Sequence, residues 1–291
     1  MDPKTIASQK MAEMIEAEIK SFVRTSPLNR MPDDARLPFF DEPLVGFADG
    51  NDSLFTEFKT IIGPVHLTPI EALVKTHDKQ PEDVGQLVSV ISWILPIVQK
   101  TRESNRAETT APSRDWAYTK WYGEKFNNAL RKHVVDMLTI RSYLSTAPAV
   151  QPFFKSATNE KGDFSNWSER HIAYVAGLGT FSLSDGFITE KGIAHRCGSV
   201  VVDLKLPPNP RTATTPYSNC LFYVNKSCIA CIKRCPVGAI TEVGHDKIKC
   251  QKYQEVELKH IKEDYQVGTS SCGLCQTKVP CEFTNPARKV K

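Results

Sequence analysis

The sequence predicts a mixed α/β (α+β) protein with a small metal-binding unit at its C-terminal end. Two bounded apolar runs, within residues 85–97 and 197–206, have the pattern of buried strands. Apolar side chains recur at every fourth position between residues 118 and 138, which is typical of a long helix packed on a sheet. All cysteines except Cys197 lie between residues 220 and 281. The sequence therefore predicts two domains, residues 1–208 and 209–291.

The N-terminal half contains further elements that the apolar pattern indicates. Residues 1–30 alternate charged and apolar side chains, which predicts an amphipathic helix. A short helix is expected over Leu54–Ile61. The stretch "GQLVSVISWILPI" predicts a buried central strand that Pro96 ends. Residues 101–113, "TRESNRAETTAPS", are polar, and we expect them to form a loop.

Two stretches complete the first domain. "NWSERHIAYVAGLG" predicts a short helix in which Asn166 and Glu169 form a capping box and Gly177 stops the helix. "CGSVVVDLKLPP" predicts another buried strand, closed by two prolines. Cys197 opens this strand, and we expect it to be a buried structural thiol.

Composition places the chain among ordinary globular proteins. It has 291 residues, 41% of them hydrophobic and 24% charged, which is enough for a proper core. No run approaches the length of a membrane span, and the N-terminal stretch lacks the apolar segment of a signal peptide. We therefore expect a cytoplasmic protein without a membrane partner, in which a cysteine cluster indicates metal binding or catalysis. The formal charge of +4 identifies no partner.

The stretch "CLFYVNKSCIACIKRCPVGAI" contains most of a bacterial ferredoxin motif. Cys228, Cys231 and Cys235, followed by proline, keep the last three positions of the C-x2-C-x2-C-x3-C-P pattern. Asn225 stands where the first ligand belongs. An amide oxygen suits iron poorly beside three thiolates, so we expect Cys220, which precedes the excursion "LFYVNKS", to supply the missing ligand.

A second group of cysteines supplies enough ligands for another cluster. In two-cluster ferredoxins the last cysteine of a motif ligates the other cluster. The predicted ligands are Cys220, Cys228, Cys231 and Cys281 for one [4Fe–4S] cluster, and Cys235, Cys250, Cys272 and Cys275 for the other. Two structural zinc sites or disulfides would use the same cysteines, and the C-x3-C-P ending favours clusters.

Three stretches together resemble a known family. "NWSERHIAYVAGLG", "FITEKGIAHRCGSVVVDLKLPP" and the cysteine pattern are similar to epoxyqueuosine reductase and its corrinoid-dependent relatives, which include reductive dehalogenases. The similarity runs from about Leu87 to Cys281. It implies a nitroreductase-like corrinoid-binding domain followed by a ferredoxin-like domain. It also implies base-off cobalamin, two [4Fe–4S] clusters and an external low-potential electron donor of ferredoxin or flavodoxin type.

The resemblance also implies roles for individual residues. Asp163, before the "ER" pair, matches the family's general acid, which would supply the proton when a carbon–oxygen bond breaks reductively. The A-G-L-G loop would lie against the corrin. The residues expected to contact the cofactor are Gly177, Leu178, Gly179, Ser182, Ser184, Thr189 and His195. A helix stop at Gly177, loop hydroxyls in solvent, a surface position for Asp163 and a backbone-bonded His195 are the structural alternatives.

The chain departs from the family pattern at three places. The last cysteine follows the proline in "CGLCQTKVPCE", "TF" replaces the tryptophan after A-G-L-G, and the chain ends shortly after Cys281, without the helical-repeat extension of some tRNA-acting members. The expected function is thus a reductase of epoxyqueuosine reductase type that acts on a tRNA queuosine precursor or a small molecule. The alternative is a ferredoxin-type electron carrier or an activator of corrinoid proteins. An exported respiratory dehalogenase is not expected, because no twin-arginine signal is present.

Overall fold

The structure, a computed structural model, describes residues 3–84, 87–160 and 162–289. Residues 1–2 of the first predicted helix, and Gly85 and Gln86 of the predicted central strand, lie outside the described residues. The helices are α1 (Pro3–Thr25), α2 (Leu54–Ile61), α3 (Pro69–His77), α4 (Gln99–Ala107), α5 (Arg114–Ile140), α6 (Glu169–Val175), α7 (Leu221–Asn225), α8 (Ala230–Arg234), α9 (Lys247–Lys252) and α10 (Ile261–Asp264). Short helical turns are η1 (Pro81–Val84), η2 (Pro148–Val150), η3 (Tyr253–Glu257), η4 (Leu274–Gln276) and η5 (Pro286–Lys289).

The strands form one main sheet and three hairpins. The main sheet has the order β1-β2-β8-β3, and its strands are β1 (Leu44–Asp49), β2 (Ser89–Pro96), β8 (His195–Val202) and β3 (Ser145–Thr146). All of its neighbouring strands are antiparallel. The hairpins pair β4 (Ser156–Asn159) with β5 (Gly162–Ser165), β6 (Gly179–Phe181) with β7 (Phe187–Thr189), and β9 (Ile240–Thr241) with β10 (Gly244–His245).

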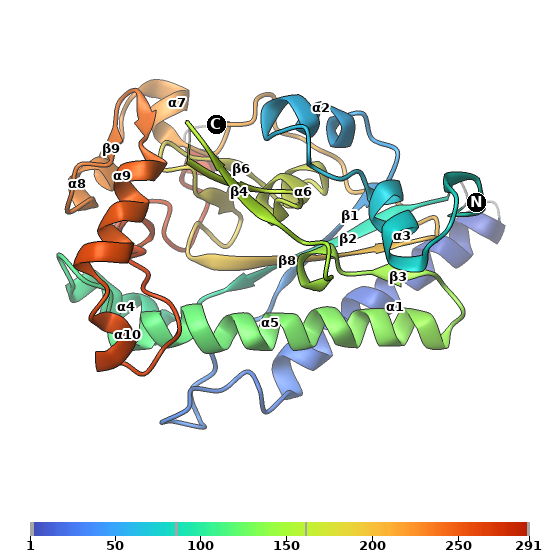
Figure 1. Ribbon diagram of the computed structural model, residues 1–291, viewed down its shortest axis with the longest axis horizontal. Coiled ribbons are helices and arrows are strands. Elements are labelled where there is room, and N and C mark those ends of the chain that lie inside the picture. Colours follow the sequence, from blue (N-terminus) through green and yellow to red (C-terminus); the bar gives the residue numbers. More distant parts are fainter. Residues whose placement is uncertain (1–2, 85–86, 161, 290–291) are drawn as a thin grey trace.

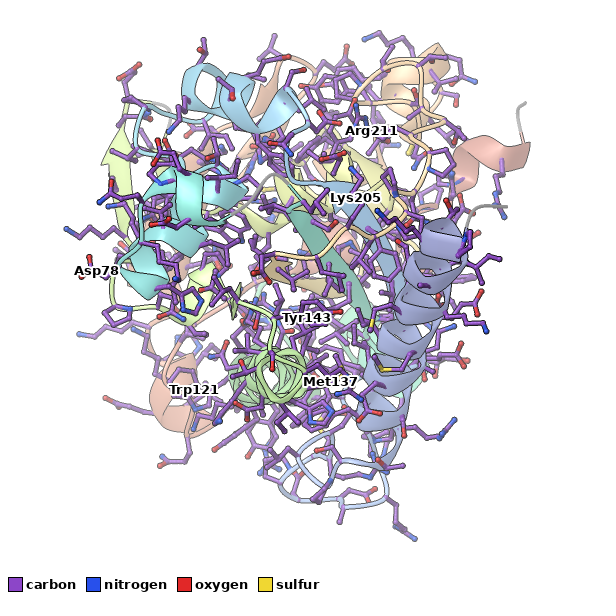
Figure 2. The ribbon with its side chains drawn as sticks, turned by 90° about the vertical axis from the view of Figure 1, so that its right-hand side faces the viewer. Asp78, Trp121, Met137, Tyr143, Lys205 and Arg211 are labelled. Carbon is purple, nitrogen blue, oxygen red and sulfur yellow. The ribbon has the colours of Figure 1, made fainter. Side chains whose placement is uncertain are left out.

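Helices cover both faces of the main sheet. Alternate side chains of β2 point to opposite faces, so Ile91 and Trp93 pack in the core formed with α1 and α5, while Val90 packs in the core formed with α2, α3 and α6. Figure 1 shows these two helical layers on either side of the strands. In Figure 2, where α5 is seen end-on, Met137 lies on the side of α5 that faces α1. This three-layer arrangement explains why every residue of β2 is buried.

Several predicted elements are confirmed. The mixed α+β class, the N-terminal helix, the helix over Leu54–Ile61, the central strand β2, the long helix α5 and the strand β8 are all present. Gly177 follows α6 with a φ of +71°, a value that favours glycine, so it stops the helix as predicted. Of the described residues, none forms a helix that is both long enough and apolar enough to cross a membrane.

The loop predicted for residues 101–113 is wrong in its first half, because residues 101–107 belong to α4, and it is confirmed for residues 108–113. The buried face of α4 carries Thr101 and Asn105, one turn apart, rather than apolar side chains. Asn105 accepts a hydrogen bond from the Ser113 amide (3.0 Å) and donates one to the Thr277 hydroxyl (3.1 Å). The helix is therefore held by polar contacts, which an apolar pattern does not reveal.

The capping box predicted for Asn166 and Glu169 is also wrong. The residue that precedes α6 is Ser168, and its side chain makes no capping hydrogen bond. Asn166 instead bonds the backbone of Phe153 and Lys155, at 2.9 and 3.0 Å, and so fastens the β4–β5 hairpin. Glu169 points into the protein, where it accepts a hydrogen bond from Ser199 at 2.6 Å.

The cysteine-rich segment gathers at one end of the molecule. In Figure 1, α7 to α10 run down the left side of the view, from α7 at the top to α10 beside α4 and the N-terminal end of α5. A small core of its own contains Phe222, Ile240 and Val279, and it is shared with Leu183, Ile188 and Ile193 from the first domain. The segment is therefore packed on the sheet domain at the end where β8 begins.

Candidate functional site

Four cysteines surround one small cavity of about 20 Å³. This first cysteine group consists of Cys220, Cys228, Cys231 and Cys281. Cys220 precedes α7, and Lys226, with a φ of +61°, ends that helix and turns the chain back toward Cys228. The side chain of Asn225 accepts a hydrogen bond from the Ser227 amide at 3.1 Å and lines none of the described cavities. The excursion thus brings Cys220, and not Asn225, to the other three thiols.

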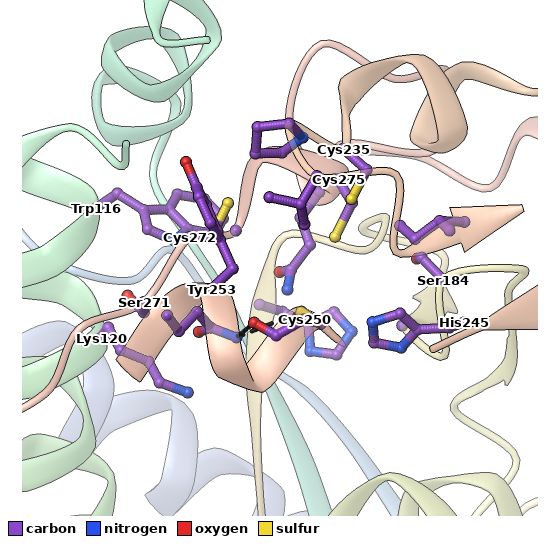
Figure 3. Close-up of a pocket in the computed structure, with 18 of the residues that line it drawn as sticks. Trp116, Lys120, Ser184, Cys235, His245, Cys250, Tyr253, Ser271, Cys272 and Cys275 are labelled. Atoms are coloured by element: carbon purple, nitrogen blue, oxygen red, sulfur yellow. Dashed lines mark hydrogen bonds between the residues drawn. The ribbon is translucent and has the colours of Figure 1, made fainter. Parts of the chain in front are cut away.

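The other four cysteines line a neighbouring cavity of about 200 Å³. This second cysteine group consists of Cys235, Cys250, Cys272 and Cys275, and Figure 3 shows it with Lys120 extending from α5 at the edge. Asp246 caps α9, which carries Cys250, by accepting a hydrogen bond from the Lys249 amide (2.8 Å). Gly273, between the last two cysteines, has a φ of +67° and lies against the Trp116 ring.

The two sets of four cysteines thus line two different cavities, and the cluster that each set would hold stays a prediction. Burial raises the pKa of Cys231 to about 11, and Cys220 and Cys228 add to the shift. Burial likewise raises the pKa of Cys272 to about 11, with a further increase from Cys250 and Cys235. Buried neighbouring thiols resist ionisation until a metal centre neutralises their charge.

All nine cysteines are free thiols, so none is joined in a disulfide. Within the described residues, no three His, Cys, Asp or Glu side chains are arranged to hold a metal ion. One zinc ion would require four sulfurs about 2.3 Å from a common centre. The thiol sets are therefore not drawn together around a single ion, and the ligand assignment of the cysteines stays a prediction.

Three adjoining cavities lie next to the cysteine groups, and Arg170 lines all three. The cysteine-side cavity is the one that the second cysteine group lines. The aromatic cavity, of about 720 Å³, is bounded by Phe58, Tyr174 and Phe181. The cationic cavity, of about 620 Å³, is bounded by charged side chains of α5, α6 and β8. The two larger cavities have the size of small-molecule pockets, roughly 300–1,000 Å³.

Asp163 lies on the β4–β5 hairpin at the wall of the aromatic cavity. Its side chain is exposed and accepts a hydrogen bond from the Thr158 hydroxyl at 2.6 Å. The position allows contact with a molecule in the cavity, and the role of general acid stays a prediction.

The glycines of the A-G-L-G stretch approach the chain's own backbone. A Cβ on Gly177 would lie 2.8 Å from the Pro210 carbonyl oxygen, and one on Gly179 would lie 2.4 Å from that of Ile188. Leu178 packs in the cores around α6. None of the three lines any of the four cavities described above. Packing accounts for these residues, and corrin contact stays a prediction.

The predicted hydroxyl residues divide between two places. Ser182 and Ser184 lie 3.0 Å apart and line the small cavity of the first cysteine group. Thr189 is fully buried and donates its hydroxyl hydrogen to the Gly192 carbonyl at 3.0 Å. Ser184 also lines the cysteine-side cavity, so neither serine lines one of the two larger cavities, and Thr189 completes a turn.

His195 lines both the cysteine-side and the cationic cavities. Its Nε2 lies 2.7 Å from the Phe187 carbonyl oxygen, an acceptor, so this nitrogen carries the hydrogen. Burial lowers the pKa of His195 to about 4, which keeps the ring neutral at pH 7. Cys197 lies beside it, with Sγ 3.6 Å from Nδ1. It is only partly buried, rather than fully buried as predicted, and it lines the cationic cavity. Desolvation raises the pKa of this thiol to about 12.

Sequence reasoning missed a charged network in the cationic cavity. Arg131 is 2% exposed and bonds Glu124 at 2.8 Å and Glu169 at 2.9 Å, while Arg196 bonds the other oxygen of Glu124. The sequence of α5 does contain a pattern that could have indicated this network, because polar residues recur at helical spacing on one face of the helix. These residues are Lys120, Glu124, Asn127 and Arg131. They share a helix face that is mostly buried, which the apolar stripe alone does not indicate.

The residues present fit both predicted cofactors. Each cysteine group offers four thiols, which is the donor set of a [4Fe–4S] cluster. A corrinoid needs a large site with flat apolar walls and a polar edge. The aromatic cavity offers the rings of Tyr174 and Phe181 together with Ser165 and Ser168, and it adjoins the cationic cavity through Arg170.

Comparison with solved structures relates this fold to known proteins. Selenomethionine-labelled epoxyqueuosine reductase matches 93% of this chain and 66% of its own, with a TM-score of 0.50 and 15% identity. Epoxyqueuosine reductase with a tRNA-Tyr stem loop matches with a TM-score of 0.48 and 17% identity over the same shares of 93% and 66%. A catabolic reductive dehalogenase matches 69% of this chain and 27% of its own, with a TM-score of 0.45 and 13% identity.

No family model and no curated protein matches the sequence. The chain spans 66% of the length of the epoxyqueuosine reductases, slightly under two thirds. At 15% identity the similarity shows the fold and leaves the activity to be argued from the site. The chain therefore has the fold of epoxyqueuosine reductase, which confirms at the level of the fold the resemblance found in the sequence.

Proposed function

We propose that the chain is a cobalamin-dependent iron–sulfur reductase of epoxyqueuosine reductase type. The observation that carries the proposal is the arrangement of two four-cysteine groups next to adjoining cavities that Arg170 connects, with Asp163 on a wall of one of them. In this proposal residues 1–208 form a nitroreductase-like corrinoid domain, and residues 209–291 form a ferredoxin-like domain with two [4Fe–4S] clusters.

The placement of the cysteines supports an electron path toward the cavities. Cys231 lies on α8 and Cys235 directly follows it, so one short helix joins the two cysteine groups. The second group borders the cysteine-side cavity, which shares Lys120, Arg170 and His195 with the cationic cavity. Electrons from an external ferredoxin- or flavodoxin-type donor would therefore pass from the first group to the second and then to the cavities.

The aromatic cavity would hold the reacting molecule beside a proton donor. Bound base-off beside Arg170, cobalamin would supply a strong reductant at its cobalt atom. Reductive removal of an epoxide oxygen consumes electrons and protons in equal number and releases water. A substrate over Asp163 would lie within reach of this exposed carboxyl group, which would act as the proton donor.

The substrate class that this chemistry suits contains a reducible carbon–oxygen bond. A tRNA queuosine precursor is the candidate that the family resemblance suggests, and a small molecule is the other. Anaerobic reconstitution with iron, sulfide and cobalamin, followed by EPR of the gel-filtered protein, tests the cofactors. We expect a base-off cobalt(II) signal together with the signals of reduced clusters. Clusters without bound cobalamin would contradict the proposal and leave an electron carrier.

A pair of variants on one hairpin tests the proton donor. Asp163→Asn removes the acidic proton from the cavity wall, and we expect turnover to fall by a factor of about 10²–10⁴, the usual contribution of general acid catalysis. Glu160→Gln makes the same kind of change outside the cavity and should leave turnover unchanged. Equal rates in Asp163→Asn and the parent protein would remove the assigned role while leaving the cofactors as proposed.

A further inference from the structure

The cationic cavity holds more positive than negative charge. Its two carboxylates, Glu124 and Glu169, are already bound by two arginines, Arg131 and Arg196. Among the described residues the cavity also contains Lys120 and Arg170, for which no further carboxylate lines its wall. The described part of the cavity wall therefore carries four cationic side chains and two carboxylates.

Lys120 has no hydrogen-bond or ion-pair partner in the described part of the chain, although Glu124 lies one helical turn away. Both oxygens of that glutamate are bonded, one to Arg131 and the other to Arg196. The Arg196 guanidinium is the main cause that lowers the pKa of Lys120 to about 7, and burial adds to it. A lysine pKa lowered by neighbouring cations indicates a positive electrostatic potential around its amine.

The remaining polar groups do not offset this charge. Among the described residues, Arg170, which is exposed, hydrogen bonds the backbone carbonyl oxygen of Asp185, and its charge helps to lower the pKa of the Asp185 carboxyl group, which lies outside the cationic cavity. His195 is neutral, because burial lowers its pKa to about 4. The Nε of Arg131 is buried and bonds to no described residue. Uncompensated charge in a half-buried site is costly, so the cavity is built for an occupant that brings negative charge.

We propose that the cationic cavity binds a phosphate ester through Lys120, Arg170 and Arg196. Guanidinium groups bind phosphate oxygens through paired hydrogen bonds, and a lysine ammonium adds a point charge. A volume of about 620 Å³ leaves room for the group that carries the phosphate. The ester belongs either to the nucleotide tail of cobalamin or to the substrate, and both present the same chemistry. The source of the ester therefore rests on the proposed function, whereas binding of inorganic phosphate tests the cavity by itself.

Titration calorimetry of the full chain, reconstituted with iron and sulfide, tests the site with inorganic phosphate as the probe. We expect one saturable site. Lys120→Gln should weaken phosphate binding about tenfold or more, because it removes one charge-assisted hydrogen bond. Lys125→Gln is the matched control on the same helix, since Lys125 lies over the rings of Trp121 and Tyr122, at 4.7 and 5.0 Å, and lines none of the three cavities.

Competition with corrinoids identifies the source of the phosphate. If cobalamin blocks phosphate binding and cobinamide, which lacks the nucleotide tail, does not, the ester is that of the cofactor. If both corrinoids bind and neither blocks phosphate, the ester is that of the substrate. Blocking by both corrinoids would overturn the proposal, because the macrocycle itself would then fill the cavity. An absence of saturable phosphate binding, or equal affinity in Lys120→Gln, would also overturn it.

Discussion

Replacing Gly273 by alanine should destabilise the second cysteine group through one identifiable contact. The added Cβ would lie 2.1 Å from Nε1 and 2.2 Å from Cε2 of Trp116, a side chain that is 4% exposed. The left-handed φ of +67° adds a cost of about 1–2 kcal/mol for a residue with a Cβ. Moving a buried ring to relieve overpacking costs about 1–3 kcal/mol more.

A second glycine separates these two contributions. Gly238 has a φ of +60°, close to that of Gly273, and its added Cβ would meet only the Lys249 Nζ at 3.8 Å. Gly238→Ala should therefore lose about 1–2 kcal/mol through backbone strain alone, whereas Gly273→Ala should lose about 2–5 kcal/mol in total. The difference between the two variants measures the contact with Trp116.

Urea denaturation of the anaerobically reconstituted variants measures the free energy of unfolding. Iron content provides a second reading, because Gly273 lies between two predicted ligands of one cluster and a displaced turn should lower occupancy of that cluster. Stabilities of Gly273→Ala and Gly238→Ala that agree within about 0.5 kcal/mol would refute the reasoning, since the ring contact would then contribute nothing measurable.

Three further changes follow from contacts of the same region and of the sheet domain. Arg234→Met should lower the free energy of unfolding by about 2–3 kcal/mol and lower the iron content, because the Arg234 guanidinium bonds four backbone carbonyls of α4, η4 and their flanking residues. Lys233→Met is the control, and its free energy of unfolding in urea should stay within about 0.5 kcal/mol of the parent protein. Glu282→Gln should cost about 3 kcal/mol in the same assay, because this carboxylate is 1% exposed and pairs with two arginines of α4. Burial lowers the pKa of His66 to about 4 and that of His171 to about 3, so the folded state binds fewer protons than the unfolded state between those values and pH 6.5. The stability that the two neutral histidine rings contribute is complete above pH 6.5 and is lost progressively below it. A urea midpoint that stays constant as the pH is lowered from 7 to 5 would contradict the neutral state of these two rings.

The cysteine grouping could be predicted because it depends on spacing along the chain. The short helix α8 separates Cys231 from Cys235, which line different cavities, and the excursion after Cys220 is long enough to return that thiol to Cys228. The helix α4 could not be predicted in this way, since Asn105 stabilises it through Ser113 and a distant residue of the cysteine-rich segment. Such a partner is known only once the chain has folded.

The cationic cavity escaped prediction for a related reason. Its charged side chains come from α5, α6 and β8, and each looks like an ordinary surface residue when its own stretch is considered alone. Only the sheet, which places β8 between the two helices, brings Arg131, Glu169 and Arg196 together. Net charge gives no hint either, because a local surplus of cations is compatible with a formal charge of +4 for the whole chain.

The stretch that carries the family resemblance most specifically serves the fold. Gly177 lets the end of α6 pass close to the backbone of Pro210, so a side chain there would displace the segment that leads to the cysteines, while Gly179 lets β6 pass close to Ile188 of its hairpin partner β7. A match in this stretch therefore predicts how the two halves of the chain join. It does not by itself identify what the cavities bind, because other residues line them. The substrate must consequently be sought through Asp163 and the charged residues around Arg170, where this chain can differ from proteins of the same fold.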